Sequence, residues 1–108
     1  MTLWLTKRDL QTIKTIHDKY PEVEEVLIYG SRAKGNDRKG SDIDLVIMNE
    51  NVSQETISRV KFDFEESTLA YFVDVAHYPT IKDPGLKEHI ARVGKTLFRK
   101  GKGIEASP

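Results

Sequence analysis

The chain has 108 residues, of which 38% are apolar, and its 17 basic and 17 acidic side chains give a formal net charge of zero. This balance provides no general attraction to nucleic acid or to an anionic membrane, so it excludes the broad basic surface with which a polymerase holds a long template. The absence of cysteine excludes disulfides and thiolate metal sites.

The length and composition predict a single globular domain. We expect it to occupy residues 1–100, followed by a disordered tail over residues 101–108. No apolar stretch approaches the ~20 residues of a membrane span. The N-terminal segment is too short and too polar to be a signal peptide. A cytoplasmic protein is therefore expected.

Helix signals and apolar periodicity define the elements along the chain. Thr6 and Asp9 have the spacing of a capping box, and Pro21 closes the helix that follows. The predicted elements, in chain order, are a helix over 6–20, a strand over 23–29, a helical turn over 31–34, a strand over 42–48, a helix capped by Ser53, a strand over 69–76, a helix over 84–93 and an extended segment over 95–99. This order predicts an α/β (α+β) domain with a small mixed β-sheet and flanking helices.

A Gly30-Ser31 turn follows the first apolar strand, and Asp42 and Asp44 begin the second strand ten residues later. Alternate side chains of a strand share a face, so the two carboxylates point the same way and repel each other. Hard divalent cations such as Mg²⁺ would remove that repulsion and still leave room for phosphate. The turn and the acid pair together indicate a site for a metal-bound nucleotide.

Each of these features also has a simpler interpretation when taken alone. A Gly-Ser dipeptide often does no more than turn the chain. The basic cluster that includes Arg32 and Lys34 could be a solvated loop. The Asp42–Asp44 pair could mark a solvent-exposed strand end. Their combination within a short segment favours the nucleotide site.

The segment Tyr29-Gly30-Ser31, ten intervening residues and Asp42-Ile43-Asp44-Leu45 resembles the signature of the DNA polymerase β-type nucleotidyltransferase superfamily. The short chain and the ten-residue spacing resemble the minimal nucleotidyltransferases (MNT), antitoxins encoded beside HEPN toxins. The resemblance covers residues 6–99 and implies a minimal nucleotidyltransferase fold. It also implies a third carboxylate on a later strand, for which Asp74 is the candidate.

The resemblance implies a role for each residue of the motif. The residues that would bind the nucleotide phosphates are Gly30 and Ser31, with Arg32 and Lys34 as charge partners. The acids that would hold two Mg²⁺ ions are Asp42, Asp44 and Asp74. Asp74 either completes the ligand set of the catalytic metal or accepts the proton of the attacking hydroxyl.

The resemblance further implies transfer of AMP from ATP to a hydroxyl acceptor, namely a tyrosine of a HEPN-type toxin. Two other functions stay open. The chain could be a non-catalytic antitoxin that neutralises its partner by binding, or a nucleotidyltransferase that acts on a small molecule. The sequence also leaves open whether the chain forms homo-oligomers or hetero-oligomers.

The three histidines do not have the spacing of a zinc site. His17 is expected on or beside the packing face of the first helix, and His89 is expected to face solvent. His77 follows the strand that carries Asp74, which leaves open a position at the rim of the site.

Overall fold

The computed structural model of this protein describes residues 6–29, 43–67, 69, 72–99 and 103–104. The helices are α1 (Lys7–Asp18), α3 (Gln54–Glu65) and α4 (Pro84–Val93), with a 3-10 turn η1 (Tyr78–Thr80). The strands are β1 (Glu25–Tyr29), β2 (Ile43–Ile47), β3 (Val73–His77), β4 (Lys95–Arg99) and β5 (Gly103–Ile104). The predicted Gly-Ser turn and the helical turn over 31–34 lie outside the described residues.

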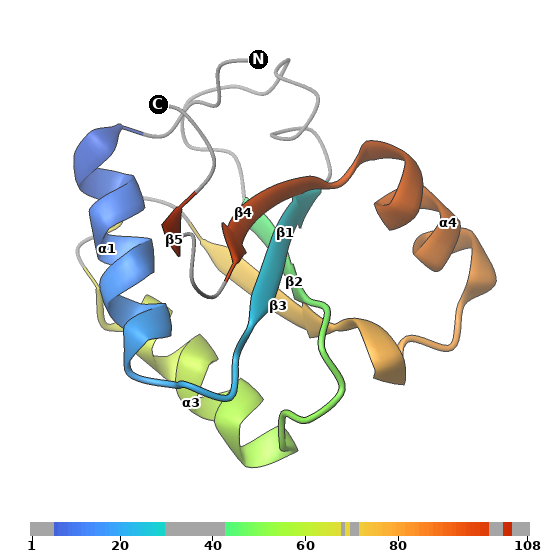
Figure 1. Ribbon diagram of the computed structural model, residues 1–108, viewed down its shortest axis with the longest axis horizontal. Helices are drawn as coiled ribbons and strands as arrows, with labels where there is room; N and C mark the ends of the chain where they lie inside the picture. Colours follow the sequence, from blue (N-terminus) through green and yellow to red (C-terminus); the bar gives the residue numbers. More distant parts are fainter. Residues whose placement is uncertain (1–5, 30–42, 68, 70–71, 100–102, 105–108) are drawn as a thin grey trace.

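The strands form one mixed sheet in the order β3-β2-β1-β4-β5 (Figure 1). β1 is the middle strand and pairs antiparallel with both β2 and β4. β2 and β3 run parallel, and α3 connects them, as a parallel pair requires a crossover. The predicted α/β (α+β) class, with a small mixed sheet and flanking helices, is confirmed.

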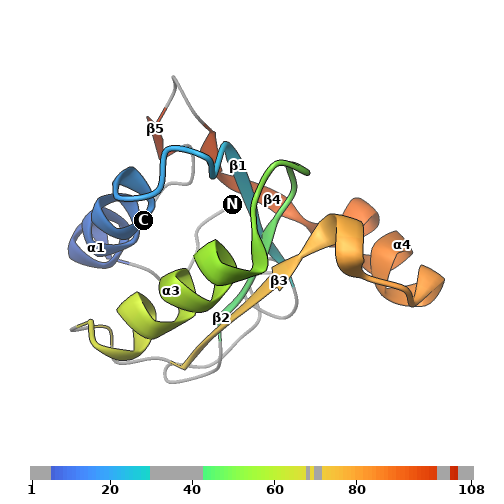
Figure 2. The ribbon, with the colours of Figure 1, turned by 90° about the horizontal axis from the view of Figure 1, so that it is seen from below.

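Helices cover both faces of the sheet (Figure 2). α1 and α3 pack on one face over the main apolar core, to which the strands contribute residues such as Ile28, Leu45 and Val75. α4 packs on the other face over a smaller cluster around Val46 and Ile90. Because both faces are covered, β2 is almost wholly buried, as its apolar sequence predicts.

Side-chain caps start each of the three helices in the described part of the chain, as the sequence predicts. Thr6 and Asp9 form a reciprocal capping box at α1, with both bonds 3.0 Å long. Ser53 Oγ accepts from the Thr56 N–H at the start of α3, and Asp83 Oδ1 accepts from the Gly85 N–H at the start of α4. None of these helices combines the length and the apolar character needed to cross a lipid bilayer within the described part of the chain.

One predicted boundary is wrong. The apolar run from Leu69 predicts a strand that starts there, but β3 starts at Val73, where pairing with Ile43 begins. Leu69 instead packs against the main core from outside the strand, because apolar composition serves either role.

A short strand lies within the segment predicted as a tail over residues 101–108, and the boundary between domain and tail stays a prediction. Gly103 and Ile104 form β5 and pair antiparallel with Arg99 and Phe98. Residues 101–102 and 105–108 lie outside the described residues. Pairing with β5 covers part of the edge of β4.

Gly94, which ends α4 and precedes β4, has no room for a side chain. A Cβ at this position would lie 2.5 Å from the Ile90 carbonyl oxygen and 3.2 Å from Leu27 Cδ1. We expect Gly94→Ala to lower the free energy of unfolding by roughly 1–3 kcal/mol, because the backbone of α4 must shift. Gly85→Ala is the matched control, since its Cβ would meet only the Asp83 side chain, at 3.2 Å. Urea unfolding that ranks the two variants equally would contradict this expectation.

Candidate active site

Two carboxylates lie side by side at one end of the sheet. Asp44, the second residue of β2, pairs in parallel register with Asp74, the second residue of β3. Residues paired in this way project their side chains on the same face of a sheet. On the other side of β2, Asp44 pairs with Tyr29, the last residue of β1. Tyr29, Asp44 and Asp74 therefore form a row across three strands, on the face that α4 covers, and we call it the acidic row.

The charges of the two acids act on Tyr29, its neighbour in the acidic row. Tyr29 is buried, and this burial, together with the charges of Asp44 and Asp74, raises the pKa of its phenol to about 12. The phenol therefore stays neutral at physiological pH. Asp44 is half-buried and Asp74 is exposed, so the row opens to solvent on the β3 side.

The pattern of apolar residues forces both acids onto this face. The residues that alternate with Asp44, such as Ile43 and Leu45, are fully buried against α1 and α3. Val73 and Val75 flank Asp74 in the same way. A slip of one residue in either strand would remove these apolar side chains from the main core and place a carboxylate in it, so the register is strongly specified. The sequence prediction that Asp74 faces away from Val73 and Val75 is confirmed.

Helix α4 brings a histidine to the acidic row. The His89 ring lies 6.4 Å from the Tyr29 ring, centroid to centroid, in an edge-on arrangement. His89 is half-buried, whereas the sequence predicts a solvent-facing side chain. Helical periodicity could not reveal this contact, because it depends on where α4 packs across the sheet.

His77 lies on the opposite face from the acidic row. It is buried on the α3 side of β3, and its Nε2 atom forms a 2.8 Å hydrogen bond with the Asn49 carbonyl oxygen. The alternative that placed His77 at the rim of the site is therefore wrong. Side chains of a strand alternate between its two faces, and His77 is the third residue after Asp74. The two side chains therefore point to opposite faces of the sheet.

The other predicted site residues are Gly30, Ser31, Arg32, Lys34 and Asp42, and all of them lie outside the described residues. The described strands nevertheless show where that segment is attached. β1 ends at Tyr29 and β2 begins at Ile43, next to each other at the upper end of the sheet in Figure 1. This is the end that carries the acidic row. Among the described residues, no three His, Cys, Asp or Glu side chains could together hold a metal ion, so the predicted set of three acids stays a prediction.

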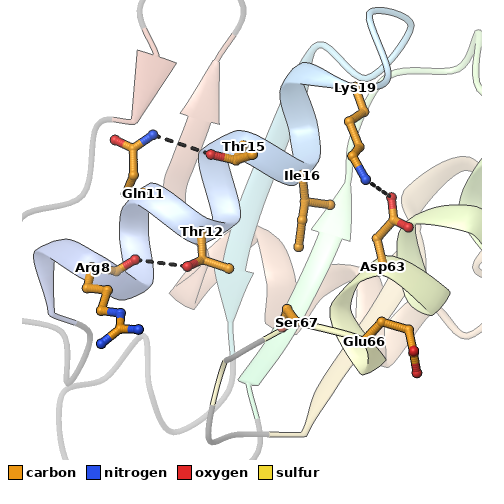
Figure 3. Close-up of a pocket in the computed structure, with 9 residues that line it drawn as sticks. All are labelled: Arg8, Gln11, Thr12, Thr15, Ile16, Lys19, Asp63, Glu66 and Ser67. Atoms are coloured by element: carbon orange, nitrogen blue, oxygen red, sulfur yellow. Dashed lines mark hydrogen bonds and ion pairs between the residues drawn. The ribbon is translucent and has the colours of Figure 1, made fainter.

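A groove of about 490 Å³ lies on the other face of the molecule, between α1 and the end of α3 (Figure 3). Two pairs of its polar side chains interact with each other: Gln11 Nε2 donates to Thr15 Oγ1 over 3.4 Å, and Lys19 Nζ lies 3.5 Å from an Asp63 oxygen. It shares no residue with the acidic row. The residues that line it are Arg8, Gln11, Thr12, Thr15, Ile16, Lys19, Asp63, Glu66 and Ser67.

Comparison with known proteins places this arrangement in a family. The model of the polymerase beta nucleotidyltransferase family matches residues 11–102. The chain is 31% identical over 102 residues to the probable protein adenylyltransferase MntA of Haemophilus influenzae, covering 94% of this chain and 89% of that protein.

Solved structures share the fold. A toxin–antitoxin crystal structure with AMP-PNP has a TM-score of 0.68 at 18% identity, over 86% of this chain and 75% of that one. A complex of a tri-AMPylated HEPN toxin of Shewanella oneidensis with an MNT antitoxin has a TM-score of 0.59 at 16% identity, over 83% and 72% of the two chains. The family match spans most of the chain and agrees with the observed sheet, so this chain belongs to the polymerase beta nucleotidyltransferase family.

Proposed function

We propose that this chain transfers AMP from ATP to a tyrosine hydroxyl of a HEPN-type partner protein and thereby acts as an antitoxin. The observation that carries the proposal is the pairing of Asp44 with Asp74 on one face of the sheet, beside the end of β1 and open to solvent on the β3 side. The similarity to MntA, a probable protein adenylyltransferase, supports the reaction. The shared fold with an MNT antitoxin bound to a tri-AMPylated HEPN toxin supports the partner.

The carboxylates of the acidic row fit a hard divalent cation. Two anions in adjacent register repel each other unless a cation lies between them or beside them. Asp44 and Asp74, together with Asp42 two residues before Asp44, are the residues that would hold two Mg²⁺ ions. When bound, such a pair neutralises the charge that develops on the entering and leaving oxygens.

The side chains of the chain itself would bind and orient the reactants. The backbone at Gly30 and the hydroxyl of Ser31 would bind the triphosphate, with Arg32 and Lys34 balancing its charge. The tyrosine oxygen attacks the α-phosphorus of ATP, a new P–O bond forms, and the bond between the α- and β-phosphates breaks to release pyrophosphate. Asp74, whose carboxylate is exposed, would either complete the ligand set of the catalytic metal or accept the proton that the tyrosine hydroxyl loses.

A transfer assay with labelled ATP tests this function. The protein is incubated with Mg²⁺, ATP labelled at the α-phosphate and the HEPN-type protein encoded by the neighbouring gene. We expect label on a tyrosine of that protein, and we expect the label to disappear with an Asp42→Asn/Asp44→Asn double variant, since these acids would hold the metal.

The same assay separates the proposal from its two alternatives. A non-catalytic antitoxin would bind and neutralise the partner without labelling it, and its protection would survive loss of the acids. A small-molecule nucleotidyltransferase would leave the partner unlabelled and modify a low-molecular-weight alcohol instead. Undiminished labelling by the double variant would refute the assigned site.

A further inference from the structure

We propose that the exposed ring of Phe72 is a positioning residue that holds the aromatic ring of the acceptor tyrosine next to Asp74. This inference rests on the function proposed above and concerns how the acceptor reaches the site. Phe72 would contact the substrate without taking part in proton or phosphoryl transfer.

Phe72 is a large apolar residue in an exposed position. Its side chain is 58% exposed, and only one other large apolar side chain, that of Phe62, is so exposed in the described part of the chain. The Phe72 carbonyl accepts from the Ile43 N–H over 2.8 Å, so backbone pairing with β2 extends one residue before β3. Alternation along this extended segment places the ring on the same face as Asp74, two residues further on.

The order of the strands indicates the side from which the acceptor enters. The segment expected to hold the phosphates follows β1, whereas Asp74 and Phe72 belong to the strand on the far side of β2. In phosphoryl transfer, the attacking oxygen and the leaving group lie roughly in line on opposite sides of the phosphorus. If the pyrophosphate lies on the β1 side, the acceptor would enter from the β3 side. β3 is the strand at that edge of the sheet, so a protein acceptor has access to it.

An aromatic ring at this position suits a tyrosine acceptor. Aromatic pairs prefer edge-on or offset arrangements with their centroids roughly 4.5–7 Å apart, which would orient the phenol oxygen relative to the protein surface. An aliphatic alcohol would gain much less from such a contact. Phe72 would thus favour tyrosine over serine or threonine as the acceptor.

Steady-state kinetics with Phe72→Ala test this inference, with Phe62→Ala as the matched control. Phe62 is 60% exposed on α3, away from the acidic row, so both variants remove an exposed phenyl ring. The substrates are Mg²⁺–ATP and the purified HEPN-type protein encoded by the neighbouring gene. For Phe72→Ala we expect the KM for that protein to rise roughly tenfold, with kcat and the KM for ATP within about twofold of the wild type. Phe72→Tyr should restore the wild-type KM, and Phe62→Ala should not change it.

The outcomes separate this inference from the function on which it rests. An unchanged KM for the acceptor in Phe72→Ala overturns the role of Phe72 and leaves the transferase function intact. A selective rise in the KM for ATP also overturns it, because the ring would then contact the nucleotide. A wild-type chain that labels no acceptor at all overturns the proposed function, and this inference with it.

Discussion

Replacing Asp74 by asparagine is expected to reduce the rate of AMP transfer by roughly 10²–10⁴-fold, the usual contribution of a positioned acid or base. The exchange keeps the size of the side chain and removes its negative charge. Asp74 is exposed, and the apolar residues that anchor β3, Val73 and Val75, lie on the other face. The variant should therefore fold normally, so the loss would report on the chemistry. Single-turnover transfer and thermal unfolding, measured on the same preparation, check both parts.

Asp18→Asn is the matched control for this variant. Asp18 is also exposed, but it pairs with Lys14 on α1, away from the acidic row. We expect it to retain the wild-type transfer rate. If the Asp74→Asn variant kept the wild-type rate of AMP transfer, Asp74 would be excluded from the catalytic machinery. Asp44 would then lack its proposed acid partner in that site.

The second large effect concerns His17, which is buried in the main core. Its ring stacks on that of Phe98 at 5.3 Å and meets the edge of Phe64 at 5.8 Å. Neither ring nitrogen has a hydrogen-bond partner within the described residues. Burial therefore lowers the pKa of His17 from 6.5 to about 4, although the nearby charge of Asp18 opposes this shift. The sequence prediction that His17 lies on or beside the packing face of the first helix is confirmed.

This shift predicts a loss of stability on mild acidification. The unfolded chain takes up a proton at His17 near pH 6.5, whereas the folded chain does so only near pH 4. The contribution of neutral His17 to stability is thus complete above pH 6.5 and is lost as the pH falls toward 4. The loss from this residue should amount to about 3 kcal/mol, at 1.36 kcal/mol for each unit of pKa.

Urea unfolding at pH 7.5 and at pH 4.5 measures the effect. The variant His17→Leu should be much less sensitive to pH than the wild type, because it removes the group that titrates. His89→Gln is the control: His89 is only half-buried, so its loss should leave the pH dependence in place. Equal pH dependence in the wild type and in His17→Leu would show that His17 is not the cause.

Local sequence patterns predicted much of this protein. The capping residues Thr6, Ser53 and Asp83 start the three described helices, because hydrogen bonds over two or three residues do not depend on the rest of the fold. The alternation around Asp44 and Asp74 likewise determined which face of its strand each acid would occupy.

Only the tertiary structure decided which elements meet. Parallel pairing of β2 with β3 brings together two acids that lie 30 residues apart, and antiparallel pairing adds Tyr29 from β1. The contact of His89 with Tyr29 and the pairing of β5 with β4 depend in the same way on neighbours distant in sequence. Periodicity reports which side of an element is apolar, but the choice of partner comes from the packing of the whole chain. For this reason the sequence could identify the acids as candidates, whereas the pairing of the strands decided that they lie side by side.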